Sequence, residues 1–311
     1  IVQKSICMKN LQSYLVNFIN SKLFISKQGL DSLLLFLSRV QDFNLDDDYS
    51  YTNETSDLCK KLSTKGVPLT VNYSNQELVD NSVALHRVEG TIFADQDPWD
   101  YFFSTSALIQ NLVAADNNPK IGSHLLYVYS GGGEAYMLDD ATNVIANLKK
   151  PVIAVTYKYN CSAAYHISCA ADKIYATNRF DTIGCIGSMM SGLDIIPYFE
   201  KLGMKYYEIY ADLSSEKNSR IRELKNGNQK PLVKEELNLL AGNFVDTVKN
   251  FRGITDKHVL AGQDYYANVC GDLKLIDGII TLDQAVAEAY SLAKDYTDRS
   301  KKIEYAINNL I

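Results

Sequence analysis

Short apolar runs alternate with stretches of helical spacing along the middle of the chain. The runs are rich in β-branched residues, as in "PVIAVTYKY" (Pro151 to Tyr159), which is typical of a buried strand. Such alternation predicts βαβ units and an α/β fold with a mostly parallel sheet and flanking helices. We expect strands at residues 82–92, 123–129, 151–159, 172–177 and 205–210, and helices at residues 105–115, 136–150, 194–202, 231–251 and 282–293, with one more from Ser162.

The two ends of the chain differ from this middle part. Residues 6–43 carry two helical apolar faces separated by Gly29, which predicts helices. Residues 44–75 are rich in Asp, Asn, Ser and Thr, which is typical of a linker. We therefore divide the chain into an N-terminal helical segment with a polar linker (1–80), an α/β domain (81–293) and a C-terminal helical arm (294–311).

Composition narrows the class of protein. The 311 residues are 46% apolar, and the net charge of −6 argues against a nucleic-acid-binding surface. The six cysteines form no CxxC pair, which indicates reduced thiols. With only four histidines a His-rich metal site is not expected, and we expect no cofactor. No run reaches the ~18–20 apolar residues of a membrane span, and the N-terminus lacks a signal-peptide layout. We expect a cytoplasmic protein.

A serine stands where the strand at 151–159 turns into a helix. The sequence there is "NCSAAYHISCAADKIYA" (Asn160 to Ala176), so Ser162 would lie at the helix N-terminus with Ala163 and Ala164 behind it. Backbone N–H groups at a helix N-terminus lack intrahelical partners and suit an anion or oxyanion. Two interpretations of Ser162 stay open at this point: a helix-capping residue or a nucleophile.

Two segments with several glycines follow predicted strands. "YSGGGEA" (Tyr129 to Ala135) separates a strand from a helix, and its glycines permit close approach of the backbone. It contains neither GxxxxGK[ST] nor GxGxxG, and Glu134 would repel phosphate, so an oxyanion loop or a structural turn is favoured over a phosphate cradle. "TIGCIGS" (Thr182 to Ser188) predicts a second tight loop near the same edge of the sheet.

A nucleophilic serine needs a base. His166 lies one helical turn after Ser162 and is expected to pack within the fold, and His258 has no evident acidic partner. A lysine can act as a base only when neutral, which requires burial or a positive neighbour. The candidate lysines in the polar segment 212–230 are Lys217, Lys225 and Lys230, with a solvated surface charge as the alternative for each.

Five motifs in order resemble the signal peptide peptidase A family of Ser/Lys serine proteases, which includes phage head-maturation relatives. They are "YSGGG", "KKPVIAVTYKYNCSAAYHISCAADKIYA", "TIGCIGS", "YFEKLGMKYYEIYA" followed by Lys217, and "LKLIDGI". The resemblance covers residues 82 to 290 and implies a Clp/crotonase-like fold with hydrolysis of peptide bonds.

Carried over residue by residue, the resemblance implies that Ser162 is the nucleophile and that Lys217 is its general base. Gly132, Gly133 and Ala163 would supply the backbone N–H groups of the oxyanion hole. The resemblance also implies a homo-oligomer with sites near subunit interfaces, in which serine and lysine can come from neighbouring subunits. The partners would be peptide or protein substrates.

The chain departs from the family's motifs at several positions. Gly131 replaces the usual Pro, and "SAAYH" replaces "SGGYY", which introduces His166. Cys185 replaces a serine that can hydrogen-bond the catalytic lysine, and Lys274 stands where the closing motif usually has Gly. We include Cys185 and His166 as candidate supporting residues.

Three alternatives stay open. The departures leave room for a catalytically inactive assembly or scaffold homologue on the same fold. A Clp-type Ser-His protease would need a histidine near residues 184–188, and none lies between His166 and His258. A crotonase-type enzyme would use paired backbone N–H groups for an acyl-thioester enolate, which explains the glycines but not Ser162.

Overall fold

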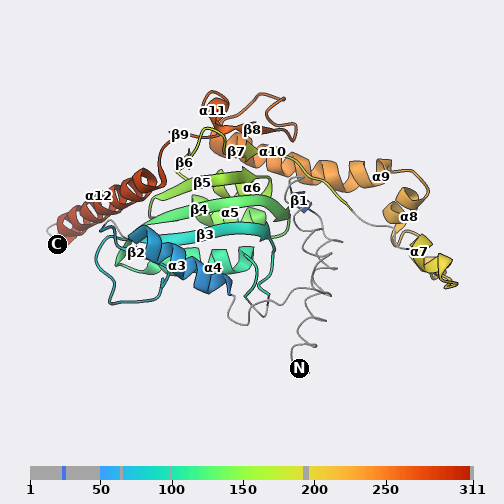
Figure 1. Cartoon of the computed structure of the whole chain (residues 1–311), viewed down its shortest axis with the longest axis horizontal. Coiled ribbons are helices and arrows are strands. Elements are labelled where there is room, and N and C mark those ends of the chain that lie inside the picture. Colours follow the sequence, from blue (N-terminus) through green and yellow to red (C-terminus); the bar gives the residue numbers. More distant parts are fainter. Residues whose placement is uncertain (1–22, 26–49, 64–65, 98–99, 192–195, 309–311) are drawn as a thin grey trace, which may run out of the picture.

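A mostly parallel sheet forms the centre of the protein. The computed structural model describes residues 23–25, 50–63, 66–97, 100–191 and 196–308. Six parallel strands lie in the order β2-β3-β4-β5-β6-β9 (Figure 1). Their bounds are Leu69–Thr70, Ser82–Ile92, Ile121–Glu134, Val152–Cys161, Lys173–Ala176 and Gly278–Ile279. The α/β fold expected from the pattern is confirmed.

Three further strands extend this sheet. β7 (Thr182–Gly184) pairs in parallel with the end of β5, and β8 (Asp264–Tyr266) pairs antiparallel with β7. β1 (Leu23–Ile25) pairs antiparallel with the last residues of β4. These short strands therefore gather around the ends of β4 and β5.

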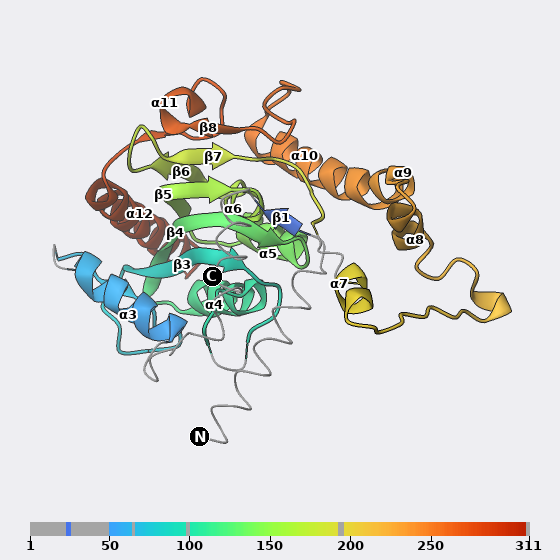
Figure 2. The ribbon, with the colours of Figure 1, turned by 45° about the vertical axis from the view of Figure 1, so that its right-hand side comes forward.

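Helices cover both faces of the sheet, as Figures 1 and 2 show. α4 (Thr105–Asn117), α5 (Leu138–Ala146), α6 (Ala163–Ser168) and α10 (Asn238–Arg252) share one apolar cluster with the sheet. α3 (Tyr51–Leu62) and α12 (Leu282–Asn308) share the other. Side chains of β4 alternate between the clusters, with Leu126 and Val128 in the first and Leu125 and Tyr127 in the second. Burial on both faces explains the continuous apolar runs of the sequence.

The middle part of the chain follows the predicted order of elements, with three differences. β4 continues through the glycines to Glu134, because their backbones pair with β3. The strand predicted at 205–210 is wrong, since these residues form no regular element. The helix predicted at 231–251 comprises α9 (Lys230–Leu232), a π-helical turn (Val233–Leu237) and α10. α12 runs continuously from Leu282 to Asn308.

The N-terminal part departs further from the prediction. Most of the helix predicted at 6–43 lies outside the described residues, and its described part is the strand β1. The linker predicted at 44–75 is wrong at α3. Ser50 caps this helix, accepting a hydrogen bond from the N–H of Asn53 at 3.3 Å. The polar composition fits a helix whose outer face meets solvent.

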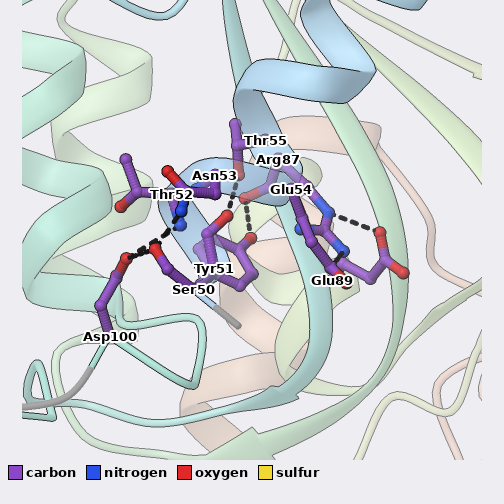
Figure 3. Close-up of polar contacts among 9 residues, drawn as sticks. All are labelled: Ser50, Tyr51, Thr52, Asn53, Glu54, Thr55, Arg87, Glu89 and Asp100. Carbon is purple, nitrogen blue, oxygen red and sulfur yellow. Dashed lines mark hydrogen bonds and ion pairs between the residues drawn. The ribbon is translucent and has the colours of Figure 1, made fainter. Parts of the chain in front are cut away.

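Polar contacts dock α3 onto β3 (Figure 3). The hydroxyl of Tyr51 donates to the carbonyl oxygen of Arg87 at 2.5 Å. The Arg87 guanidinium, whose side chain is only 8% exposed, pairs with Glu54 at 2.5 Å and Glu89 at 2.7 Å. The Ser50 hydroxyl donates to the Asp100 carboxylate at 2.6 Å. Pairing patterns of this kind have no periodic signature, so sequence patterning missed the helix.

An arm projects from the sheet between residues 196 and 232. It contains α7 (Ile196–Lys201), a 3-10 turn (Asp212–Ser214), α8 (Ser219–Lys225) and α9, and both views place α7 and α8 away from the sheet (Figures 1 and 2). Among the described residues, no helix combines the length and apolar character needed to cross a membrane.

Candidate active site

Ser162 occupies a strained turn between β5 and α6. Its φ of 57° and ψ of −123° lie in a region that non-glycine residues rarely adopt. The Ser162 N–H donates to the carbonyl oxygen of Gly184 at 2.8 Å, and its own carbonyl accepts from the N–H of His166 at 2.9 Å. The side chain makes no capping hydrogen bond to the helix. The capping interpretation is therefore wrong, and strain at this position is of the kind that functional sites store.

A buried amide fixes the approach to this turn. Asn160 is fully buried, and its amide donates to Ser168 at 2.9 Å and to Thr156 at 3.2 Å. The Ser168 hydroxyl donates back to the side-chain oxygen Oδ1 of Asn160 at 3.1 Å. These contacts tie the end of β5 to the last residue of α6 and so position Ser162. The sequence analysis missed this role, because a lone Asn before a turn carries no distinctive spacing.

The glycine-containing residues 130–134 form the end of β4 rather than a loop, and we call them the glycine strand. Gly133 lies so close to β3 that a Cβ atom there would stand 2.0 Å from the carbonyl oxygen of Ile92. Gly132 has a φ of 103°, which favours glycine. Ser130 holds both strands, since its hydroxyl donates to the Gly90 carbonyl at 2.6 Å and accepts from the Gly132 N–H at 3.1 Å. Ser130 is a second positioning residue that the sequence analysis did not assign.

Sheet register brings the glycines towards Ser162. The last pair between β4 and β5 joins Ser130 and Asn160. Gly132 and Ser162 each lie two residues beyond this pair, at the carboxyl ends of adjacent parallel strands. Ala163 follows Ser162 directly and begins α6, where N–H groups have no intrahelical acceptor. Ser162, Ala163 and the glycines thus meet at one end of the sheet.

Cys185 lies against Ser162. It directly follows β7 with a φ of 55°, and its N–H donates to the carbonyl oxygen of Gln263 at 2.9 Å. Burial, the largest cause, raises the pKa of the Cys185 thiol to about 11, and the charge of Asp264 raises it further. The side-chain hydrogen bond with Ser162 acts in the opposite direction. The thiol is therefore neutral at physiological pH and contacts the Ser162 hydroxyl.

His166 is held by α5 behind the turn. Its Nδ1 lies 2.9 Å from the Thr142 hydroxyl, and its Nε2 lies 3.4 Å from the carboxylate of Asp139. The ring also packs against Phe244, with 4.8 Å between ring centroids. The hydrogen bond from His166, the largest cause, lowers the pKa of Asp139. His166 thus fits the packing role expected for it, and both its ring nitrogens are engaged away from the serine.

Lys217 lies in the projecting arm. Its side chain is exposed, and it stands between the 3-10 turn and α8, with its N–H donating to the Ser214 carbonyl at 3.0 Å. Both views place α8 well apart from α6 (Figures 1 and 2). Within one chain, the structure does not bring Lys217 to Ser162.

The closing motif, residues 274–277, contacts α6 and β6 through hydrogen bonds. The Tyr165 hydroxyl donates to the Leu275 carbonyl at 2.9 Å, and the Asp277 carboxylate accepts from the Ile174 N–H at 2.8 Å. Lys274 has a φ of 62°, which explains why glycine suits this position. No group of three His, Cys, Asp or Glu side chains suited to a metal ion occurs in the described part of the chain.

The fold and the site define a class of α/β protein with a strained serine at the carboxyl end of a parallel sheet. The family model of peptidase family S49 matches residues 145–295, just under half of the chain, and this span contains both Ser162 and Lys217. Residues 145–295 therefore form a peptidase family S49 region, and the resemblance to the signal peptide peptidase A family is confirmed.

Two curated relatives agree with this assignment. A protein named as a signal peptide peptidase SppA of Enterococcus faecium is 24% identical over 239 residues, which cover 74% of this chain and 64% of the relative. A protein named as a protease of Methanocaldococcus jannaschii is 26% identical over 188 residues, which cover 59% of each. The chain thus matches less than two thirds of the length of these relatives.

Two solved structures show the extent of the similarity in fold. An enoyl-CoA hydratase/isomerase family member has a TM-score of 0.41 at 15% identity, covering 70% of this chain and 74% of the other. A ClpP1 mutant from Listeria monocytogenes has a TM-score of 0.37 at 12% identity, covering 65% of this chain and 94% of the other.

Proposed function

We propose that this protein is a serine endopeptidase in which Ser162 is the nucleophile and Lys217 of a neighbouring copy is the general base. The observation that carries the proposal is the strained turn at Ser162, which lies inside the S49 region and next to the glycine-containing end of β4. Ser162 is buried and does not cap its helix, and backbone strain of this kind clusters at functional sites. It suits a hydroxyl that must be aimed at a substrate carbonyl.

The reaction would be acyl transfer. Lys217, in its neutral form, takes the proton of the Ser162 hydroxyl as the oxygen attacks the scissile carbonyl. The backbone N–H groups of Gly133 and Ala163 would stabilise the resulting oxyanion, because the N–H of Gly132 already donates to the Ser130 hydroxyl. Lys217 then returns the serine proton to the leaving amine as the C–N bond breaks. Water then hydrolyses the ester to release the second product and restore the serine. A lysine base predicts activity that rises from neutral to alkaline pH.

The exposed arm supports a base supplied by a second copy. Seven large apolar side chains of the arm are more than half exposed: Tyr198, Leu202, Met204, Tyr206, Tyr207, Ile209 and Leu213. Soluble monomers rarely expose apolar side chains in such a contiguous run. Packing of the arm on a neighbouring subunit would bury these side chains and carry Lys217 with them.

The test is covalent labelling of the whole protein with a fluorophosphonate, followed by mass spectrometry of intact protein. We expect one adduct on the wild type, none on Ser162→Ala, and a strongly reduced rate on Lys217→Ala. Lys225→Ala, a neighbouring lysine of the same arm, serves as the matched control and should label at the wild-type rate.

Two results would contradict the proposal. Equal labelling of Lys217→Ala and wild type would exclude Lys217 as the base while keeping Ser162 as the nucleophile. No labelling of any variant between pH 7 and 10 would favour the inactive scaffold homologue.

A further inference from the structure

The end of β4 has a second edge that the chain itself fills. At Gly132 and Gly133, one edge of β4 still pairs with Thr91 and Ile92 of β3. The opposite edge loses its partner where β5 turns away after the Ser130–Asn160 pair. β1 occupies this vacated edge, with Ile25 opposite Gly132, Phe24 opposite Gly133 and Leu23 opposite Glu134.

This edge is the one that faces Ser162. A strand added to a sheet lies about 4.8 Å from its neighbour. β1 therefore takes the place that β5 would have continued to fill, and Ser162 lies two residues beyond the last residue of β5 that pairs with β4. Figures 1 and 2 agree, since both place β1 at the end of β4 next to α6.

Ser162 is closed to solvent in the same arrangement. Its exposed fraction is only 1%, so an external peptide cannot reach its hydroxyl without a rearrangement. An extended peptide that adds to a sheet edge binds mainly through its main chain. β1 already supplies such a backbone to the glycine strand, in antiparallel orientation.

We propose that β1 is an autoinhibitory strand that occupies the substrate-binding edge of β4. The inference rests on the proposed function, because it assumes that peptide substrates bind beside Ser162. Substrate would bind only in the fraction of molecules in which β1 has left the edge, so labelling of Ser162 would be slowed by that fraction. The occupant is bound through its backbone, so the site would accept extended peptides of varied sequence.

The test uses the full chain carrying Phe24→Pro. Proline has no N–H and cannot take part in a strand ladder. Val79→Pro is the matched control, because Val79 lies in an exposed segment between β2 and β3, remote from the β4 end. Hydrogen exchange of residues 130–134 and the rate of fluorophosphonate labelling of Ser162 are measured on all three proteins.

We expect faster exchange at residues 130–134 and a several-fold faster labelling in Phe24→Pro, with neither change in Val79→Pro. A synthetic peptide of residues 21–27, "SKLFISK", should slow the labelling of Phe24→Pro back towards the wild-type rate.

Each failure can be told apart. Unchanged exchange in Phe24→Pro would show that β1 does not occupy the edge, and faster exchange with unchanged labelling would show that it does not inhibit. Either result overturns the inference. Absence of labelling in every variant would contradict the proposed function, and with it the inhibitory role, while the exchange data would still report on the pairing.

Discussion

The hydroxyl of Ser130 donates a hydrogen bond to the carbonyl oxygen of Gly90, with 2.6 Å between the two oxygens. The same hydroxyl accepts from the N–H of Gly132 at 3.1 Å. One side chain thus fixes the glycine strand against β3 and sets the direction of the backbone that faces Ser162. Ser130 is buried, so its hydroxyl acts through these two hydrogen bonds to the backbone.

Replacing Ser130 by Ala should show whether this hydroxyl affects the reactivity of Ser162 beyond its effect on the free energy of unfolding. We expect Ser130→Ala to lose about 1–2 kcal/mol of unfolding free energy, because the Gly90 carbonyl loses its donor, and to label at Ser162 about tenfold more slowly. Ser123 is the matched control, since its hydroxyl donates to the Ala289 carbonyl at 2.7 Å from the other end of β4. Ser123→Ala should lose similar stability in urea unfolding and keep its labelling rate. Equal slowing of both variants would contradict the positioning role.

The contact between Cys185 and Ser162 gives a second prediction. A hydroxyl forms stronger hydrogen bonds than a thiol, so Cys185→Ser should hold the Ser162 hydroxyl and the incoming lysine at least as well as the native residue. We expect labelling of Ser162 to quicken a few-fold in Cys185→Ser and to slow in Cys185→Ala. Rates measured by intact mass at one pH decide the order. Slower labelling of the serine variant than of the alanine variant would exclude a supporting role for this position.

The parts of the site that could be predicted from sequence are those with a pattern. Alternating apolar runs predicted the parallel sheet, and the serine at a strand-to-helix boundary predicted the turn at Ser162. The glycines were expected to leave the sheet, but pairing with Ile92 depends on a close approach that only the folded register reveals. Asn160 acts through one buried amide, which leaves no periodic trace.

Long-range relationships were harder still. The resemblance assigned Lys217 as the base, but nothing in the pattern of the arm shows that the arm leaves the domain. β1 lies in a stretch whose apolar spacing predicts a helix, and its strand pairing exists only because β4 offers an open edge. The polar residues of α3 predicted a linker. The contacts that hold this helix, with Arg87 and Asp100, are themselves polar and leave no apolar pattern in the sequence.

A buried pair of histidines predicts how stability depends on pH. His86 Nε2 lies 3.1 Å from His124 Nδ1, and both rings are buried. Burial, the largest cause in each case, lowers the pKa of both histidines. Below about pH 6.5 the unfolded state therefore binds more protons at these two histidines than the folded state does. Their contribution to the free energy of unfolding is complete above this pH and is lost as the pH falls.

The experiment measures the free energy of unfolding in urea from pH 7.5 to 5. We expect a loss of about 2–4 kcal/mol for the wild type across this range, about 2 kcal/mol for each histidine that stays neutral in the folded protein. His86→Phe keeps an aromatic ring against Tyr73, which stacks on His86 at 4.8 Å, and should roughly halve the slope. The exposed His258→Gln is the control and should keep it. Equal slopes for wild type and His86→Phe would show that another group causes the acid sensitivity.

The separation of Ser162 and Lys217 within one chain predicts complementation between copies. Ser162→Ala and Lys217→Ala, each with little labelling alone, should form labelled assemblies when co-expressed, because the first supplies Lys217 to the intact Ser162 of the second. The adduct should appear only on the Lys217→Ala chain, which intact mass distinguishes. Leu213→Asp places a charge on a side chain that is fully exposed in one chain, so it should weaken assembly in sedimentation and reduce complementation together. Recovery of labelling by a compact monomer, or none in a stable assembly, would show that the base comes from elsewhere.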